Sequence, residues 1–388
     1  MFRGSGGRQA RTACAALASV DMPNVLIYAD SIRSPELRHE VPVAAPDAFV
    51  YVERNGSRHV YASSIELPRL VELADLEVFA YDELGLDELI KQKLGPHERE
   101  RELVLRACRH AGVEAVVTPA SFPLDAADHL RANGIELHPD GKLFDLRRRA
   151  KSDVELEGVR RAQRGCELAL DAIRARLRQG GGLTCEELRA EALRVFTEEG
   201  LIAPDLVIVS HGPQTAIGHE PGYGPIEPGE PVVVDLFPRD FETGCYADMT
   251  RTFCIGEPPE LLVEQHALCL ESLERVYGAV RAGVPGSELH RISCEPFEAA
   301  GYPTQLTKEE GQVLDEGYFH SLGHGVGLEV HEQPSLGRVG EELVEGDVIA
   351  IEPGVYKKGF GGCRLEDLVR VAADGCERLT DYPYDLAP

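Results

Sequence analysis

The stretch PVVVDLFPRDFETGCYADMTRTFCI, residues 231–255, carries one aspartate on each arm of a predicted β-hairpin. Asp235 follows an apolar, β-branched run, and Asp248 comes at the start of a second run after the polar tip 238–244. Residues on paired strands can share a face when their numbers differ by an odd value, and these two differ by 13. Two carboxylates this close are stable together when a cation lies between them. The alternative is a solvated hairpin with two unrelated aspartates.

A second group of polar residues follows in the last third of the chain. The glycine-broken segment FHSLGHGVGLEVHEQP, residues 319–334, contains three histidines: His320, His324 and His331. Glu352 ends the apolar run in VIAIEPGVY, and Glu366 is predicted to lie inside the apolar strand CRLEDLVRV. Each of these carboxylates alone could be a salt-bridged or edge residue. Together with the hairpin they make four carboxylates and one imidazole on strand ends, where buried charge needs compensation. One or two divalent metals, such as manganese, cobalt, iron or zinc, would provide it.

The composition argues against two classes of partner. Lys plus Arg number 40 against 66 Asp plus Glu, so the formal net charge of -26 repels nucleic-acid phosphates. No apolar run approaches the roughly 20 residues that a membrane span needs. Ten cysteines without a C-x-x-C pair suit reduced thiols, and we expect a cytoplasmic protein.

The order of the patterns predicts an extension followed by two domains. Residues 1–21 are interpreted as a loosely structured extension, or as the result of an upstream start codon, with a signal peptide as the alternative. Residues 22–148 alternate helical patterns with the short apolar runs NVLIYA, DAFVYVE, EVFAY, EAVVTP and GIELHP. This alternation predicts an α/β domain with a mostly parallel or mixed sheet. The basic, polar segment GKLFDLRRRAKSDVE marks the boundary, and residues 149–388 form the second domain.

The second domain shows the same arrangement twice. Two helical patterns precede strands, and then two more helical patterns precede the last strands. The helical patterns cover residues 152–182, 184–200, 259–283 and 287–301. Ser152 opens the first pattern, and Thr184 with Glu187 has the spacing of a capping box at the second. The sequence therefore predicts an internal duplication of a helix pair with its strands.

In chain order, Asp235, Asp248, GHGVG, EPG and RLED resemble the motifs of the creatinase/methionine-aminopeptidase ("pita-bread") metallopeptidases. The resemblance implies an α+β pita-bread catalytic domain with pseudo-twofold halves, preceded by the α/β domain of prolidases and Xaa-Pro aminopeptidases. It also implies two divalent metal ions, manganese with cobalt or zinc as alternatives. The implied metal ligands are Asp235, Asp248, His324, Glu352 and Glu366. Family members commonly separate the two aspartates by eleven positions, whereas here they are 13 positions apart. The additional residues are assigned to a wide loop at 238–244.

The same resemblance implies roles around the metals. His219, His331 and Glu352 would be catalytic, and Glu352 would also shuttle protons for a hydroxide that bridges the metals. The residues implied to contact the substrate are His219, His320, His331 and Arg364. Thr250 would buttress the metal shell through its hydroxyl.

The expected activity is metal-dependent hydrolysis of the Xaa-Pro bond in dipeptides, as in Xaa-Pro dipeptidase (prolidase). The alternatives are an Xaa-Pro aminopeptidase that acts on longer peptides and a non-catalytic binding protein of the same fold. Many prolidases have a basic residue after VHE-x-P, whereas this chain has Ser335, with Arg338 three places later. Recognition of the substrate carboxylate is therefore in doubt or moves to Arg338, Arg364 or His320. The expected partners are small peptides with proline after the first residue, and a second copy of the chain in a homodimer.

Overall fold

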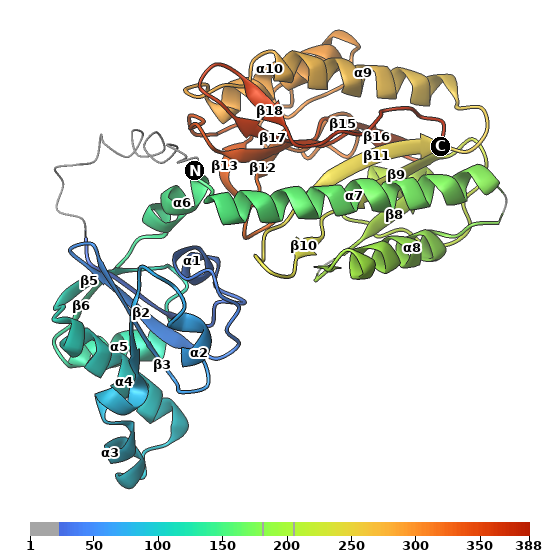
Figure 1. Cartoon of the computed structure of the whole chain (residues 1–388). Coiled ribbons are helices and arrows are strands. Elements are labelled where there is room, and N and C mark those ends of the chain that lie inside the picture. The colour runs from blue at the N-terminus through green and yellow to red at the C-terminus, as the bar shows by residue number, and fades with distance from the viewer. Residues whose placement is uncertain (1–22, 181, 205) are drawn as a thin grey trace, which may run out of the picture. The chain divides into compact units, whose positions relative to one another are not determined.

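The computed structural model describes residues 23–180, 182–204 and 206–388, which form two compact units (Figure 1). Unit 1 comprises the described residues up to Leu37 together with Ala45–Gly141. Unit 2 comprises Arg38–Ala44 together with Lys142–Pro388. The predicted extension 1–21 lies outside the described residues, and the domain boundary between 148 and 149 remains a proposal from the sequence.

Unit 1 is built on a six-stranded sheet with the order β4-β3-β2-β1-β5-β6. Antiparallel pairing joins β1 to β2 and β2 to β3, and parallel pairing joins the other neighbours, so the sheet is mixed. The strands are β1 Val25–Ala29, β2 Phe49–Arg54, β3 Ser57–Ala62, β4 Glu77–Ala80, β5 Ala115–Thr118 and β6 Glu136–Pro139. The helices are α1 Pro35–Glu40, which crosses into unit 2, α2 Leu67–Leu70, η2 Tyr81–Leu84, α3 Leu86–Lys91, α4 Pro96–Ala111 and α5 Leu124–Ala132.

One strand of this sheet, β3, was not predicted. Its first half, beginning at Ser57, is polar and partly exposed, so it lacks the apolar run that marks the other strands. The signal that could have found it is the turn before it. Asn55 and Gly56 have φ angles of 51° and 82°, the left-handed pair that a two-residue hairpin turn requires.

The first half of unit 2 places two helices against a three-stranded sheet, β11-β9-β8. Its main elements are α7 Asp153–Gln179, α8 Cys185–Glu198, β8 Ile208–His211, β9 Pro231–Leu236 and β11 Met249–Cys254. Short elements connect them: β7 Leu201–Ile202, η3 Gly212–Ala216 and β10 Arg239–Asp240. The Ser152 and Thr184 side chains accept hydrogen bonds from backbone N–H groups three residues later, as their positions predicted.

The second half repeats this plan with a five-stranded sheet, β13-β12-β14-β17-β18. Its elements are α9 Glu260–Tyr277, α10 Gly286–Ala299, β12 Gly323–Gly325, β13 Glu332–Leu336, β14 Val348–Ile351, β17 Asp367–Val371 and β18 Cys376–Arg378. A separate hairpin pairs β15 Gly354–Lys357 with β16 Gly361–Arg364. Helix α9 ends at Tyr277, before the expected end at 283, because Gly278 follows it and glycine is a poor helix former.

The strands of unit 2 lie between the two helix pairs, as Figure 1 shows. Along β14, Val348 and Ala350 join the hydrophobic core that contains α7 and α8. Ile349 and Ile351 join the other core, which contains α9 and α10. Since side chains alternate along a strand, one sheet buries both of its faces. The predicted duplication of helix pair plus strands is confirmed.

The basic junction before α7 belongs to unit 2 from Lys142 onward. It forms helix α6 Gly141–Arg149. The Arg149 guanidinium donates two hydrogen bonds to the buried carboxylate of Asp347, at 2.9 and 2.6 Å. The separate stretch 38–44 also lies in unit 2, where His39 Nδ1 is 2.8 Å from Glu155 Oε1. Unit 2 is thus assembled from two stretches of chain that unit 1 separates.

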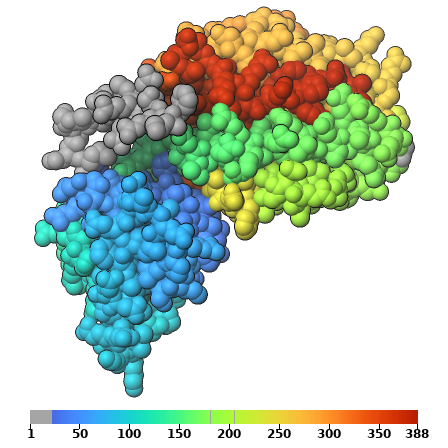
Figure 2. Space-filling model, viewed as in Figure 1, coloured from blue at the N-terminus to red at the C-terminus, as the bar shows by residue number. Residues whose placement is uncertain are grey.

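The chain's C-terminal segment lies along α7, next to its green surface in Figure 2. The Tyr382 hydroxyl donates to Asp171 Oδ1 at 2.9 Å, and Arg174 donates to Asp385 Oδ2 at 3.1 Å. Across the described ranges, no helix has both the length and the apolar character to cross a membrane.

Candidate active site

Unit 2 contains a cavity of about 250 Å³ whose walls come from both of its halves. The lining residues are Leu206, Ile208, His219, Asp235, Phe237, Asp248, His324, Val330, His331, Glu352, Arg364 and Glu366. Eight of the nine residues singled out in the sequence for a site are therefore brought together, and the ninth, His320, does not line this cavity.

The β9–β11 hairpin supplies the two aspartates. Its register pairs Asp235 with Thr250, so Asp248 lies two residues before that pair and on the same face. Both aspartates are buried. The tip is a wide loop, which the Asp240 N–H closes by donating to Cys245 O at 2.8 Å. The predictions of a shared face and a wide tip are confirmed.

The second half supplies the two glutamates. Glu352 directly follows β14, as predicted. The prediction that Glu366 lies inside a strand is wrong. The residue lies between β16 and β17, where the chain leaves a hairpin to enter the five-stranded sheet. The Thr250 hydroxyl donates to Glu366 Oε2 at 2.7 Å, and the Glu366 N–H donates to Thr250 O at 3.1 Å. Thr250 thus joins the two halves at the cavity.

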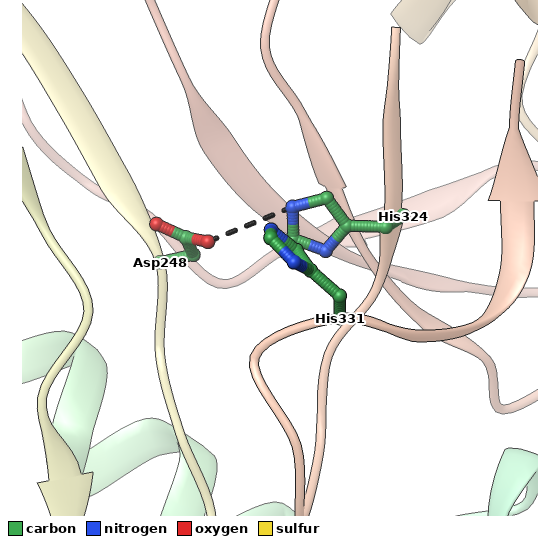
Figure 3. A group of neighbouring side chains, drawn as sticks. All are labelled: Asp248, His324 and His331. Atoms are coloured by element: carbon green, nitrogen blue, oxygen red, sulfur yellow. Dashed lines mark ion pairs between the residues drawn. The ribbon is translucent and has the colours of Figure 1, made fainter. Parts of the chain in front are cut away.

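His324 faces these carboxylates from β12. Its Nδ1 lies 3.1 Å from Gly325 O, so Nδ1 carries the proton and Nε2 is left with a free lone pair. Nε2 lies 3.7 Å from Asp248 Oδ2 and 3.8 Å from Glu352 Oε1, and Figure 3 shows the ring directed at Asp248. Burial and the neighbouring His331 lower the pKa of His324 to about 3, so the ring is neutral at pH 7.

The glycines of GHGVG allow the histidine strand to lie in the middle of the sheet. A Cβ on Gly323 would lie 2.0 Å from Ala350 O, and one on Gly325 would lie 2.2 Å from Gln333 O. Larger residues would push β12 away from β14 and β13. Both glycines are therefore needed for the position of His324.

The cavity concentrates negative charge. Burial, followed by the nearby Glu366 and Asp235 carboxylates, raises the pKa of Asp248 well above its ordinary value. Burial and the Glu352 and Asp235 carboxylates do the same to the pKa of Glu366. Burial also raises the pKa of Glu352 to about 8, although Arg364 acts in the opposite direction. A cation among these groups would reverse each shift.

The donor atoms fit divalent metals. Three overlapping groups of side chains each bring ligand atoms within 4.8 Å of one another. The groups are Asp235, Asp248 and Glu366; His324, Glu352 and Glu366; and Asp248, His324 and His331. Asp235 Oδ1 is buried without a hydrogen-bond partner, which leaves a lone pair for an ion. Carboxylates with one or two imidazoles suit manganese, cobalt or zinc.

The other residues implied by the resemblance surround this set. His219 and His331 line the cavity, and the His331 ring lies edge-on to His324 with centroids 4.2 Å apart (Figure 3). Burial and His219 lower the pKa of His331, which favours its neutral form. Arg364 Nη2 donates to Asp235 Oδ2, and Arg364 Nε donates to the Thr250 hydroxyl at 3.2 Å.

His320 is connected to the cavity through hydrogen bonds and does not line it. Its Nδ1 is 2.7 Å from Ser321 O, and its Nε2 is 3.0 Å from the Tyr356 hydroxyl. Tyr356 in turn accepts a hydrogen bond from Arg364 Nη1 at 3.4 Å. Both nitrogens of His320 are thus engaged within the protein, and its link to the site runs through Tyr356.

Sequence reasoning missed the apolar side of the cavity. Leu206, Ile208, Phe237 and Val330 form this side. The signal was present, because Phe237 is two residues after Asp235 and so shares its face of the hairpin. An apolar wall beside the ligand set provides a place for an uncharged side chain.

A second cavity of about 400 Å³ adjoins the first across His324, His331 and Glu352. Ser335 and Gln333 line it, whereas Arg338 lines neither cavity. Arg148 and Glu332 also line it, and their charged atoms lie 3.5 Å apart.

The position of His331 depends on the residue that follows it. The Glu332 side chain is only 2% exposed and is paired with Lys151, which is 4% exposed. Lys151 comes from the basic junction and also donates to Arg148 O at 2.6 Å. This buried pair fixes the start of β13 and, with it, the backbone beside His331.

The chain is similar to several known proteins. A model of metallopeptidase family M24 matches residues 157–373. The chain is 33% identical over 251 residues to the Xaa-Pro dipeptidase of Pyrococcus furiosus. This alignment covers 64% of this chain and 67% of that protein. The chain is 31% identical over 334 residues to the probable dipeptidase PepE of Mycobacterium tuberculosis, covering 84% of this chain and 82% of that protein.

Solved structures agree with these matches. The prolidase from Pyrococcus horikoshii OT3 superposes with a TM-score of 0.75 at 25% identity, covering 94% of this chain and 95% of that chain. The X-Pro aminopeptidase from Thermotoga maritima MSB8 superposes with a TM-score of 0.76 at 23% identity, covering 93% of this chain and 96% of that chain, and shows likeness in fold. The resemblance and the fold class inferred from the sequence are confirmed.

Proposed function

The chain belongs to metallopeptidase family M24, and on this premise we propose that it hydrolyses the Xaa-Pro bond of dipeptides with the help of two divalent metal ions. The observation that carries the proposal is the convergence of three buried carboxylates, the partly buried Glu352 and His324 on one cavity from both halves of unit 2. The similarity to an Xaa-Pro dipeptidase and a prolidase supports the substrate class.

The proposed metal ligands are Asp235, Asp248, His324, Glu352 and Glu366, and the proposed metal is manganese, with cobalt or zinc as alternatives. When bound, two such ions supply a hydroxide nucleophile at neutral pH and Lewis-acid polarisation of the peptide carbonyl. The unpartnered Asp235 Oδ1 and the raised pKa of Asp248 support this assignment, because both are explained by a cation in the cavity.

Glu352 is proposed to move the proton. Its carboxylate lines the cavity, and its Oε1 lies 3.8 Å from His324 Nε2, so it is within reach of a water held among the proposed ligands. It takes a proton from the attacking water and returns it to the proline nitrogen as the peptide bond breaks. The secondary amine then leaves as a neutral group.

His219 and His331 are proposed to contact the substrate at the scissile carbonyl. Both line the cavity, and a neutral imidazole can donate one N–H to the oxygen on which negative charge develops. Arg364 is proposed to orient Asp235 and the substrate. His320 is proposed to act through Tyr356, because both of its ring nitrogens are already engaged.

A specific feature favours an Xaa-Pro aminopeptidase as the second candidate. The adjoining cavity of about 400 Å³ extends beyond His331 and is lined by Ser335, where a basic residue would hold a dipeptide carboxylate. This space would accommodate residues after the proline. We infer that an aminopeptidase substrate would fill the adjoining cavity with the residues after its proline, whereas a dipeptide would leave that cavity empty.

The test compares substrates and metals on one preparation. Protein stripped with a chelator is reloaded with Mn²⁺, Co²⁺ or Zn²⁺, and the metal content is measured. Hydrolysis of Leu-Pro, Leu-Pro-Ala and the control Leu-Ala is then followed. We expect cleavage of Leu-Pro that depends on metal and exceeds cleavage of the other two. Faster cleavage of Leu-Pro-Ala would favour the aminopeptidase. Bound metal without cleavage of either proline peptide would favour a non-catalytic binding protein.

We also propose a homodimer in a reducing compartment such as the cytoplasm. The nine cysteines among the described residues are free thiols, and eight of them are buried, which supports the second point. Sedimentation at several protein concentrations would test the first.

A further inference from the structure

A second buried cluster lies on the other side of the strands that carry the site. Arg251 follows Thr250 on β11, and Asp367 follows Glu366 at the start of β17. Successive side chains alternate along β11, so Arg251 points to the face opposite Thr250, and neither Arg251 nor Asp367 lines the cavity. Each side chain is 1% exposed, and Arg251 Nη2 donates to Asp367 Oδ1 at 2.8 Å.

The guanidinium of Arg251 is fully occupied. Its five N–H groups make five hydrogen bonds, the full number that an arginine can donate. Two go to Thr250 O at 2.9 Å and Glu366 O at 2.8 Å, and one goes to Asp367. The remaining two go to carbonyl oxygens of the C-terminal segment, Pro383 and Tyr382.

The carboxylate of Asp367 is satisfied as well. Its Oδ2 accepts hydrogen bonds from the hydroxyls of Tyr277 and Tyr384. The Tyr384 ring also covers the guanidinium, with the Arg251 carbon 4.5 Å from the ring centroid. Since a buried ion pair is stable only when its remaining donors and acceptors are paired, the cluster is complete.

This cluster connects the three-stranded and the five-stranded sheet of unit 2. Strand β11 belongs to the sheet whose hairpin carries Asp235 and Asp248, and β17 belongs to the sheet that carries His324 and leads into Glu352. One planar guanidinium holds the carbonyl of Thr250, on β11, and the carbonyl of Glu366, the residue just before β17. A planar five-donor group fixes their separation, which a flexible ammonium could not do.

We propose that Arg251 and Asp367 are positioning residues that set the spacing between the two halves of the metal-ligand set. The pair touches neither substrate nor metal. It acts through the backbones of Thr250 and Glu366, and so it determines how tightly two ions are held. This inference rests on the proposed function, because it takes the cavity carboxylates to be metal ligands.

The chain offers a matched control. Arg149 and Asp347 form another buried ion pair in unit 2, with side chains 6% and 0% exposed. Asp347 precedes β14, at the end opposite to Glu352. Arg149→Lys therefore removes the same kind of interaction as Arg251→Lys, away from the cavity. Loss of stability alone would be common to both variants.

The experiment measures metal binding rather than turnover. Metal-free wild type, Arg251→Lys and Arg149→Lys are titrated with Mn²⁺ by calorimetry, and the visible absorption of bound Co²⁺ is recorded as a report on ligand geometry. Urea unfolding of the metal-free proteins gives the stability of each. We expect Arg251→Lys to weaken Mn²⁺ binding by about 10–100-fold, as for other partners of metal ligands, and to change the Co²⁺ spectrum. We expect Arg149→Lys to lose stability and to keep both metal properties of the wild type.

The outcomes separate this inference from the proposed function. Wild type that binds two ions, with Arg251→Lys unchanged in affinity and spectrum, would overturn the inference alone. Equal weakening in Arg149→Lys would also overturn it. If the wild type binds neither Mn²⁺ nor Co²⁺, the proposed function is overturned, and the inference with it. If Arg251→Lys does not fold, Tyr384→Phe replaces it. That variant removes one donor to Asp367, so a smaller shift in the same direction is expected, and no shift would refute the inference.

Discussion

Glu352 should make the stability of the metal-free protein fall as pH rises. Burial raises its pKa from 4.5 in the unfolded chain to about 8 in the folded one. Between these values the folded state binds the extra proton, so its contribution to the free energy of unfolding is fully present below about pH 4.5 and lost by about pH 8. A shift of this size corresponds to about 5 kcal/mol. About a fifth of the side chain is exposed, and water that enters there would reduce this contribution to the free energy of unfolding. We expect a contribution of at least about 2 kcal/mol.

The assay compares urea unfolding of the wild type and Glu352→Gln from pH 5 to pH 8, with a chelator present. Glutamine resembles the protonated carboxyl, so the variant should match the wild type near pH 5 and become more stable than it toward pH 8. The partly buried His320 and His324, whose pKa values are lowered to about 3, act with the opposite sign but are common to both proteins. The exposed Glu310→Gln should follow the wild-type curve. A difference between wild type and Glu352→Gln that stays constant with pH would refute the reasoning.

Three further predictions concern single side chains. His324→Ala should lower bound metal and cleavage of Leu-Pro by at least about 10–100-fold, measured by elemental analysis and kinetics, and full retention of both would contradict the ligand assignment. Lys151→Met leaves the Glu332 carboxylate buried with only Arg148 as its partner. It should cost about 3 kcal/mol in urea unfolding and reduce kcat more than it raises KM, and an unchanged kcat would show that the pair does not position His331. Ser335→Arg should raise kcat/KM for Leu-Pro about tenfold while that for Leu-Pro-Ala stays the same, because it adds a charge-assisted hydrogen bond to the dipeptide carboxylate. An equal gain with both peptides would argue against a carboxylate site there.

The sequence predicted the site far better than it predicted what surrounds it. Asp235 and Glu352 stand at or next to a strand end, and His324 lies within the short strand β12. Each has an unusual local setting, a charge or imidazole among β-branched residues or glycines. Such settings can be recognised within a few residues. Their convergence on one cavity could be inferred because an odd spacing on a hairpin and a shared need for compensation apply to any fold.

Long-range partners could not be predicted in this way. Arg251 and Asp367 lie 116 positions apart, and each alone resembles an ordinary charged residue of a strand. The interruption between β16 and β17 at Glu366 was missed for a related reason. An apolar run does not reveal that its residues belong to two different sheets. The apolar wall with Phe237 has no such unusual setting, because apolar residues next to a strand are ordinary core residues in most proteins.

The division of unit 2 into two stretches has a consequence for how the chain is made. Residues 38–44 leave the ribosome early, yet Arg38 donates to Thr243 O, 205 positions later, and His39 pairs with Glu155, 116 positions later. The rest of unit 1 is translated in between, so all residues of unit 1 have been synthesised before unit 2 can complete its fold. A shortened gene that begins at Lys142 would encode a protein whose Glu155 is left without its imidazole partner. Any attempt to produce unit 2 alone must therefore supply the seven-residue stretch Arg38–Ala44 as well.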